Sequence, residues 1–310
     1  MRIVVHGQQA FGKAVLEALL KRGENVVAVY LAPEKPGQKA DPMKEAALAA
    51  KLPLRQPASY RKPEVWEEFR ALKPDLQVMA FVTLFVPDEF LNIPTHGSIQ
   101  YHPSLLPKFR GPSSINWPII KGETETGLSI FRPTDGLDEG DVILQKRTPI
   151  GPDDTLGTVY FDRLFPMGVQ AILEAADLVL GGKHTETPQN ESNASYEGWC
   201  RTAEAKIDWA KPIDQVYNLI RGCNPAPGAW TTLQGRQLQL FDARKILFRR
   251  FADVPGKIGE VTTVTAQSFQ VTAQGGLIEV LKVRLEDGKK VSAGELGQAS
   301  VIKAGTVLGD

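Results

Sequence analysis

The first thirty residues alternate between strand and helix patterns. The apolar run Arg2–His6 ends in Gly7, a stretch of helical periodicity covers Lys13–Lys21 after Gly12, and a second apolar run covers Val26–Leu31. A strand, a turn, a helix and a second strand form the start of a βαβ unit. We therefore expect an α/β fold that opens with a Rossmann-like, mostly parallel sheet.

The glycines of this first turn do not form a dinucleotide-binding motif. Gly7 and Gly12 are separated by four residues, which differs from the G-x-G-x-x-G spacing, and no acidic residue closes the second strand. We therefore expect no nicotinamide site here, and we interpret the glycines as residues that permit a tight turn.

A histidine follows a later apolar run and precedes two prolines. In the stretch 100–111, His102 comes directly before Pro103, and Pro107 follows four residues later. Proline has no backbone N–H, so this stretch indicates a rigid loop that leaves the end of a strand. Such loops carry the chemistry of α/β folds, and histidine suits acid–base work near neutral pH. The alternative is a buried histidine that a neighbouring carbonyl satisfies.

An acidic turn lies downstream, between strand-like runs at Gly127–Phe131 and Val142–Gln145. Residues 134–141 contain two glycines and three aspartates, which favours a sharply bent loop with carboxylates in fixed places. A carboxylate on this loop is a candidate to orient His102 and stabilise its charge. The alternative is a solvated acidic turn.

The two stretches together resemble the enzyme family that uses 10-formyltetrahydrofolate. This family includes methionyl-tRNA formyltransferase, glycinamide ribonucleotide formyltransferase, sugar N-formyltransferases and the hydrolase domain of 10-formyltetrahydrofolate dehydrogenase. Its two motifs correspond to His102–Pro107 and Leu137–Gly140. The resemblance covers nearly the whole chain and is greatest to the dehydrogenase's N-terminal hydrolase domain. Further matching segments are Gly7-Gln8 with Phe11-Gly12, Lys39–Pro42, His96–Ile99, Ile115–Trp117 and Pro225–Trp230.

The resemblance implies a catalytic set of His102, Asp138 and Gln100. Protonated His102 would stabilise the oxyanion that forms when the formyl carbon is attacked, and Asp138 would orient His102 and take a proton through water. Many transferases have asparagine where this chain has Gln100. Glutamine keeps the amide donor on a longer stem. The hydrolase domain of the dehydrogenase also lacks this asparagine, so the resemblance implies a hydrolase-like site. The alternative for Gln100 is a strand residue that merely packs.

The resemblance also implies which residues contact the substrate. Leu84 and Val86 would line the folate pocket, with ordinary core packing as the alternative. Lys108 and Arg110 would meet the glutamate tail of folate or an anionic acceptor. The remaining candidates for substrate binding are Ser104, Leu105, Leu106, Asp135 and Gly136. The donor 10-formyltetrahydrofolate is the expected small-molecule partner, and we expect no metal.

A second domain is expected in the C-terminal third. A polar, Asn- and Ser-rich stretch at Pro188–Ser195 indicates a linker, and short strand-like segments with glycine turns follow it. We expect a catalytic domain at 1–190, a linker at 191–204 and a smaller β-rich domain at 205–310. The resemblance implies that this domain is a barrel, and an oligonucleotide-binding (OB-like) barrel would suit tRNA.

The amino-acid composition limits the kinds of partner and compartment that we expect. The chain has 36 basic and 36 acidic residues, so its formal net charge is zero, which argues against a dedicated nucleic-acid binder. Two cysteines provide no disulfide framework, and we expect them to be buried core thiols in a cytoplasmic protein. No apolar run approaches membrane-spanning length. The oligomeric state stays open.

The predicted activity is cleavage of 10-formyltetrahydrofolate to tetrahydrofolate and formate, or formyl transfer to a carrier. The alternatives are methionyl-tRNA formyltransferase, a sugar-nucleotide N-formyltransferase and a catalytically idle folate-binding module. In the loop Pro33–Pro42, two lysines balance Glu34 and Asp41, so this loop offers no net charge for tRNA phosphates. tRNA nevertheless stays open as an acceptor.

Overall fold

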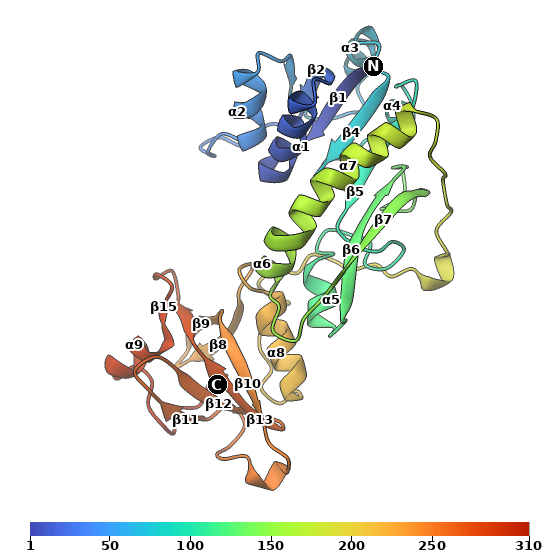
Figure 1. Ribbon diagram of the computed structural model, residues 1–310. Coiled ribbons are helices and arrows are strands. Elements are labelled where there is room, and N and C mark those ends of the chain that lie inside the picture. The colour runs from blue at the N-terminus through green and yellow to red at the C-terminus, as the bar shows by residue number, and fades with distance from the viewer. Residues whose placement is uncertain (310) are drawn as a thin grey trace. The chain divides into compact units, whose positions relative to one another are not determined.

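A computed structural model describes residues 1–309 of the chain (Figure 1). The chain divides into two compact units. The first unit comprises residues 1–111, 127–148 and 163–196, and the second comprises 112–126, 149–162 and the residues from 197 onward. The two units interleave along the sequence. The expected division into a catalytic domain at 1–190 and a β-rich domain at 205–310 stays a prediction.

The first unit is built on a seven-stranded sheet with the order β3-β2-β1-β4-β5-β6-β7. The first five strands in this order, β3, β2, β1, β4 and β5, run parallel, and β6 pairs antiparallel with β5. The strands are β1 (Arg2–Gly7), β2 (Asn25–Tyr30), β3 (Leu54–Arg55), β4 (Leu76–Ala80), β5 (Ser98–His102), β6 (Glu125–Phe131) and β7 (Val142–Pro149). The helices of this part of the chain are α1 (Gln9–Lys21), α2 (Pro42–Ala49), α3 (Pro63–Ala71), α4 (Asp88–Leu91) and α7 (Phe165–Leu180).

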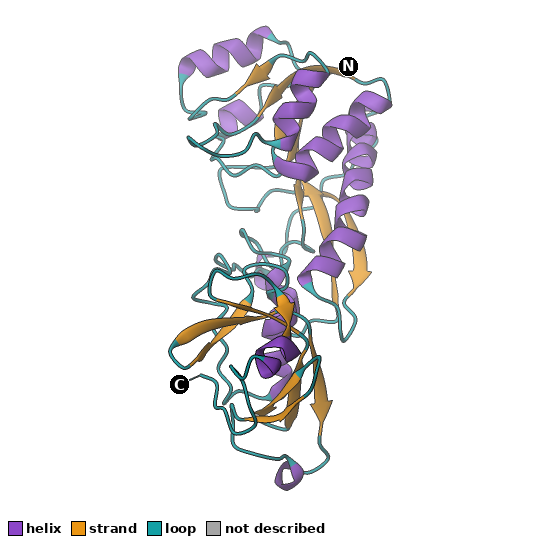
Figure 2. Cartoon of the chain, turned by 90° about the vertical axis from the view of Figure 1, so that its left-hand side faces the viewer, coloured by secondary structure: helices purple, strands orange, loops and turns teal. Residues whose placement is uncertain are grey.

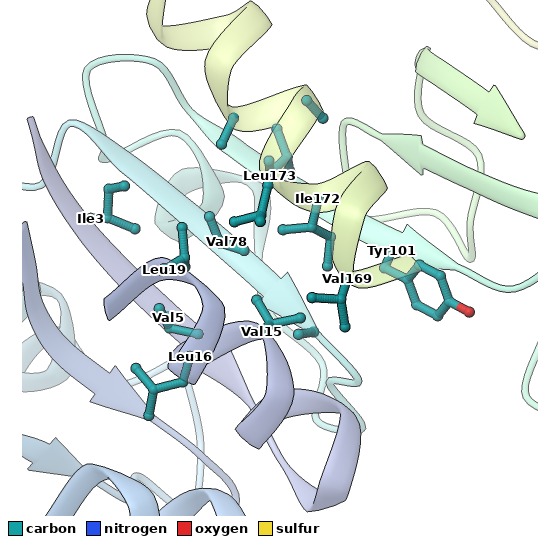
Figure 3. Close-up of a cluster of buried hydrophobic side chains, with 14 of the residues drawn as sticks. Ile3, Val5, Val15, Leu16, Leu19, Val78, Tyr101, Val169, Ile172 and Leu173 are labelled. Carbon is teal, nitrogen blue, oxygen red and sulfur yellow. The ribbon is translucent and has the colours of Figure 1, made fainter. Parts of the chain in front are cut away.

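Helices α1 and α7 pack on the parallel strands and form the main core of the first unit. Figure 3 shows Val15, Leu16 and Leu19 of α1, and Val169, Ile172 and Leu173 of α7, beside strand residues that include Val5 and Val78. The first turn passes very close to β4, because a Cβ on Gly7 would lie 2.2 Å from the carbonyl oxygen of Ala80. Glycine is therefore required at this crossing.

A polar network lies within the sheet, at His6. The Nε2 of His6 lies 2.8 Å from the hydroxyl of Tyr60, and Nδ1 lies 3.1 Å from the amide nitrogen of Gln77. The amide oxygen of Gln77 accepts from Ser98, so its nitrogen is the group that donates to His6. The network therefore satisfies a neutral imidazole, and burial lowers the pKa of His6 to about 3.

The second unit holds two four-stranded antiparallel sheets, drawn with the other strands in orange in Figure 2. One sheet has the order β10-β13-β12-β11 and the other has the order β15-β14-β9-β8. These strands are β8 (Ala229–Leu233), β9 (Arg236–Leu240), β10 (Ala243–Leu247), β11 (Val261–Val264), β12 (Phe269–Ala273), β13 (Gly276–Val280), β14 (Lys282–Leu285) and β15 (Val291–Ser292). The helices α5 (Asn116–Ile120), α6 (Leu156–Val159), α8 (Ile213–Gly222) and α9 (Ala293–Gln298) accompany them.

Two sequence-based elements differ in the structure. The apolar stretch Leu277–Val283 predicts one strand by its sequence but forms two, because the chain leaves one sheet and joins the other at Leu281, whose N–H donates to the carbonyl oxygen of Asp242. The stretch Leu156–Leu164 predicts one helix, which begins as α6 and continues as a π-helical turn, Tyr160–Leu164. The preceding residues Asp153–Thr155 predict a cap for this helix, and Thr155 does form a capping box with Thr158.

The predicted fold class is confirmed by this architecture. A mostly parallel, Rossmann-like sheet with helices is followed by a C-terminal part made of antiparallel sheets. None of the helices within residues 1–309 is long and apolar enough to cross a membrane.

Candidate active site

The order of the strands places a switch point between β1 and β4. The chain leaves β1 toward β2 on one side, and β4 and β5 lie on the other side. Ligands of open α/β sheets bind outside the carboxyl ends of the strands at such a point. The loops after β1 and β4 meet here, since the side-chain amide of Gln8 donates to the hydroxyl of Thr83 at 3.1 Å.

His102 is the last residue of β5 and is buried, with 5% of its surface exposed. Its Nε2 lies 2.9 Å from the carbonyl oxygen of Phe109. A carbonyl oxygen can only accept, so Nε2 carries the hydrogen of this bond. The other ring nitrogen, Nδ1, faces the acidic turn.

Asp138 meets His102 from that turn. Its Oδ2 lies 3.5 Å from Nδ1 of His102 and accepts a hydrogen bond from the backbone N–H of Gly111 at 2.9 Å. Asp138 has a φ of +56°, a left-handed conformation that aspartate tolerates better than most residues. The structure thus brings the two predicted residues together, and their catalytic roles stay a prediction.

The pair is complementary when the imidazole is protonated on both nitrogens. With Nε2–H bound to Phe109, a neutral ring would turn the lone pair of Nδ1 toward the carboxylate of Asp138. An imidazolium instead directs an N–H at that carboxylate. Oδ1 of Asp138 has no hydrogen-bond partner among the described residues, so this oxygen is available to a water molecule or a nucleophile.

Gln100 lies on the same strand, two residues before His102. Successive strand residues point to opposite faces, so Gln100 and His102 share a face of the sheet. Gln100 is half-buried and pairs in register with Met79 and Phe131. The catalytic role of its amide stays a prediction.

The loop after His102 is held rigidly against β6 and β7. The N–H of Leu106 donates to the hydroxyl of Ser129 at 3.1 Å, and the amide of Gln145 donates to the carbonyl oxygen of Leu106 at 2.8 Å. Ser104 is fully buried and donates to the carbonyl oxygen of Lys108 at 2.6 Å. Ser104 therefore supports the shape of the loop, while Leu105 is half-buried and Lys108 is exposed.

The contacts of Arg110 differ from those expected of a residue that binds an anion of the substrate. Its guanidinium is fully buried, and it donates to both carboxylate oxygens of Glu191, to the amide oxygen of Gln189 through two nitrogens, and to the hydroxyl of Tyr196. These five bonds use all five N–H donors of the side chain. No donor is left for a folate carboxylate, so the structure gives Arg110 a positioning role. The hydrogen bond with Glu191 raises the pKa of Arg110.

The other predicted substrate contacts divide into two groups. Val86 is buried in a core cluster that also includes Phe90, and Leu84 is half-buried against that cluster. Asp135 is exposed and accepts the N–H of Asp88 at 2.9 Å, which joins the acidic turn to the start of α4. A Cβ on the neighbouring Gly136 would lie 2.1 Å from a carboxylate oxygen of Glu139, so that exposed side chain would have to move.

The segment 189–196, which we name the strap, was not anticipated as part of the site. Its backbone pairs with the loop after His102, since Arg110 donates to the carbonyl of Ser195 at 2.9 Å and Ser195 donates to that of Pro107 at 3.1 Å. The amide of Gln189 donates to the carbonyl oxygens of Asp138 and Gly140, at 2.8 and 2.7 Å. Its polar composition resembles a linker, so the sequence carried no signal of this role.

The fold and the buried His–Asp pair define an α/β enzyme with its site at the carboxyl edge of the parallel sheet. Residues 1–175 match the family described as "Formyl transferase", and residues 200–300 match "Formyl transferase, C-terminal domain". The chain therefore belongs to the formyl transferase family, which confirms the predicted family and enzyme class.

Curated relatives include two kinds of enzyme. The chain is 38% identical over 303 residues to the human cytosolic 10-formyltetrahydrofolate dehydrogenase, covering 94% of this chain and 34% of the relative. The chain thus spans about a third of the length of such dehydrogenases. It is 36% identical over 312 residues to methionyl-tRNA formyltransferase from Syntrophus aciditrophicus (strain SB), covering 99% of this chain and 98% of the relative.

Solved structures share the fold. HypX from Aquifex aeolicus, crystallised with tetrahydrofolic acid, has a TM-score of 0.68 at 21% identity, over 96% of this chain and 47% of HypX. The sugar 3N-formyltransferase WlaRD, solved with dTDP and 5-N-formyl-THF, has a TM-score of 0.67 at 18% identity, over 91% of this chain and 97% of that one.

Proposed function

We propose that this protein removes the formyl group of 10-formyltetrahydrofolate through His102 and Asp138, with water as the acceptor. The observation that carries the proposal is the buried pair at the carboxyl end of β5, with Nδ1 and Oδ2 3.5 Å apart. The family and the relatives that are named for this folate support the choice of substrate.

The reaction begins when water attacks the formyl carbon. The free Oδ1 of Asp138 accepts the proton of the attacking water, and negative charge develops on the former carbonyl oxygen. The positive charge of protonated His102, whose two N–H groups face Phe109 and Asp138, stabilises that oxyanion through space, and the amide of Gln100 is the hydrogen-bond donor. The bond between carbon and N10 of folate then breaks, and the nitrogen takes the proton from Asp138. Tetrahydrofolate and formic acid leave, and the formic acid releases its proton to water to give formate.

The loops around the switch point are the proposed folate site. The loop after β4, which includes Leu84 and Val86, is joined to the acidic turn through Asp88 and Asp135. We place the pteridine ring between these loops because they meet at the carboxyl edge of the sheet. The exposed amine of Lys108 is the cation of this region that we assign to the glutamate tail.

Hydrolysis is preferred over transfer to tRNA because of two features of the chain. Gln100 replaces the asparagine that many transferases carry, and the loop Pro33–Pro42 has no net charge. The two free cysteines fit the proposal of a cytoplasmic enzyme.

Methionyl-tRNA formyltransferase is the second candidate. The alignment with the Syntrophus enzyme covers 99% of this chain and 98% of the relative, which favours this alternative. A sugar-nucleotide N-formyltransferase is a third candidate, because WlaRD shares the fold.

The test of the proposed function is turnover of purified protein with 10-formyltetrahydrofolate alone. We expect tetrahydrofolate and formate in equal amounts, at a rate that falls to the uncatalysed level in His102→Ala. His96→Ala is the matched control, because His96 lies in a turn before β5 and has no role in the proposal. Folate binding without any product would favour the idle binding module instead.

A further inference from the structure

The only two cysteines of the 310-residue chain meet in the second unit. Cys200 and Cys223 are separated by 23 positions, and their sulfur atoms lie 3.8 Å apart. Both side chains belong to the apolar cluster that includes Ile207 and Val216, and the expectation of buried thiols is confirmed. Neither cysteine takes part in the function proposed above.

Neither cysteine lies in the interior of a helix or strand. Cys200 lies in a segment without helix or strand, and its N–H donates to the hydroxyl of Ser113 at 2.9 Å. Cys223 is the residue that ends α8. A disulfide has an S–S length of about 2.05 Å and specific torsion angles, so the side chains must rotate toward each other. An irregular segment and a helix end accommodate such a rotation better than two helix interiors.

The two thiols differ in exposure and acidity. Cys200 is 7% exposed and Cys223 is fully buried. The hydrogen bond from Cys223 lowers the pKa of Cys200, while the same bond and burial raise the pKa of Cys223. Thiolate character and exposure together decide the reactivity of a cysteine, so Cys200 is the more reactive of these two buried thiols.

From the position of these two sulfurs we propose that Cys200 and Cys223 form a reversible two-electron oxidation site, in which Cys200 is the attacking and Cys223 the resolving cysteine. The oxidant is a hydroperoxide. The Cys200 thiolate attacks the peroxide O–O bond, giving a sulfenic acid and the leaving hydroxide or alkoxide, which takes up a proton. The Cys223 sulfur then displaces the sulfenic oxygen as water, forming the disulfide. Two thiols and one peroxide are thus converted into one disulfide, water and the reduced peroxide.

Oxidation would cross-link the ends of a segment that contains the whole of α8. A bond between Cys200 and Cys223 closes this segment into a loop and restricts the unfolded chain, which stabilises the second unit. Reduction by a dithiol removes the cross-link by exchange. The proposed site is therefore a reversible staple within the second unit.

The experiment is to treat the folded protein with hydrogen peroxide and follow its mass and thiol content. We expect the loss of both thiols with a mass decrease of two hydrogens, a cross-linked peptide containing Cys200 and Cys223, and full recovery with dithiothreitol. The unfolding temperature of the second unit should rise by several degrees in the oxidised protein.

Two serine variants test the order of the steps. In Cys223→Ser, Cys200 should accumulate as a sulfenic acid that dimedone traps. In Cys200→Ser, the buried Cys223 should lose its thiol at least ten times more slowly than the wild-type pair. The proposal is overturned if the wild-type protein keeps both thiols while glutathione in the same tube is oxidised, or if its oxidation stops at a dimedone-reactive Cys200. The wild-type measurements decide the matter even where a variant fails to fold.

Discussion

The amide oxygen of Gln189 accepts two hydrogen bonds from the guanidinium of Arg110, at 3.1 and 2.8 Å. The amide nitrogen of the same side chain donates to the carbonyl oxygens on either side of Glu139. One side chain thus joins the loop after His102 to the turn that carries Asp138. The distance between the two proposed catalytic residues therefore depends on a residue of the strap.

Gln189→Ala should lower kcat about tenfold or more and change the KM for folate less, because a small displacement of Asp138 affects the reacting geometry rather than binding. Gln189→Glu separates the two contacts, since a carboxylate still accepts from Arg110 but cannot donate to the two carbonyl oxygens. We expect this variant to keep much of the stability and little of the activity. Steady-state kinetics and thermal unfolding of both variants check this expectation.

Gln298→Ala is the matched control for the strap, because Gln298 is exposed and its amide makes one long bond, 3.4 Å, to Ala266. It should leave kcat and unfolding temperature unchanged. Wild-type kcat in a folded Gln189→Ala protein would show that the strap does not position Asp138.

His102→Ala and Asp138→Ala should each lower the rate of formyl removal by at least about 100- to 1000-fold, a cost comparable to that of losing a group that stabilises the oxyanion. Asp138→Asn should be similarly inactive, because the amide keeps the size of the side chain but cannot take the proton. Tetrahydrofolate formation, measured on variants of confirmed folding, checks these values. Activity close to that of the wild type in either alanine variant would remove the pair from the mechanism.

Gly140→Ala should disrupt the acidic turn. A Cβ at this position would lie 1.6 Å from the carbonyl oxygen of Arg132, so the backbone must move. The carbonyl oxygen of Gly140 also accepts a hydrogen bond from the amide of Gln189. We therefore expect a loss of at least about tenfold in kcat and a destabilisation of about 1–3 kcal/mol. Gly198→Ala is the control, because nothing lies within 4 Å of the added atom. Equal effects of the two substitutions on kcat would contradict the proposed packing.

The first unit should lose stability below neutral pH because of His6. Its pKa is about 3 in the folded protein and near 6.5 when unfolded, so the unfolded chain binds one more proton between these values. The free energy of unfolding therefore falls as the pH decreases, by about 1.4 kcal/mol per pH unit within this window, and the contribution is constant above it.

The measurement is urea unfolding at pH 7 and pH 5 of the wild type, His6→Gln and the control His96→Gln. The pH dependence should be about 2 kcal/mol smaller in His6→Gln than in the other two proteins, from the same proton linkage. An unchanged difference between the two pH values in His6→Gln would show that His6 does not carry this effect.

Local patterns in the sequence predicted the start of the sheet well. The elements β1, α1 and β2 follow from apolar runs and helical periodicity. These patterns lie within short segments of the sequence and need no information about distant residues. The loop at His102 was predicted because two prolines exclude regular structure. The neighbouring Asp138 could be proposed as its partner from the family motif, although its left-handed backbone leaves no separate signal in the sequence.

Other features depend on contacts between distant residues. The strap is polar, and its role depends on bonds from Gln189 to residues about 50 positions earlier. The strand β10 was not predicted, because its alternation of polar and apolar residues is weak and it contains the charged residues Arg244 and Lys245. Arg110 was expected to bind an anion, and its carboxylate partner, Glu191, lies 81 positions away. Such pairings are decided by the tertiary fold.

The most direct test of the account is the release of tetrahydrofolate from 10-formyltetrahydrofolate, measured with and without charged initiator methionyl-tRNA. The account predicts release in water alone, with formate as the other product and no increase when the tRNA is added. Release that requires the tRNA, with the formyl group recovered on its methionine, would contradict the hydrolytic function and identify a methionyl-tRNA formyltransferase.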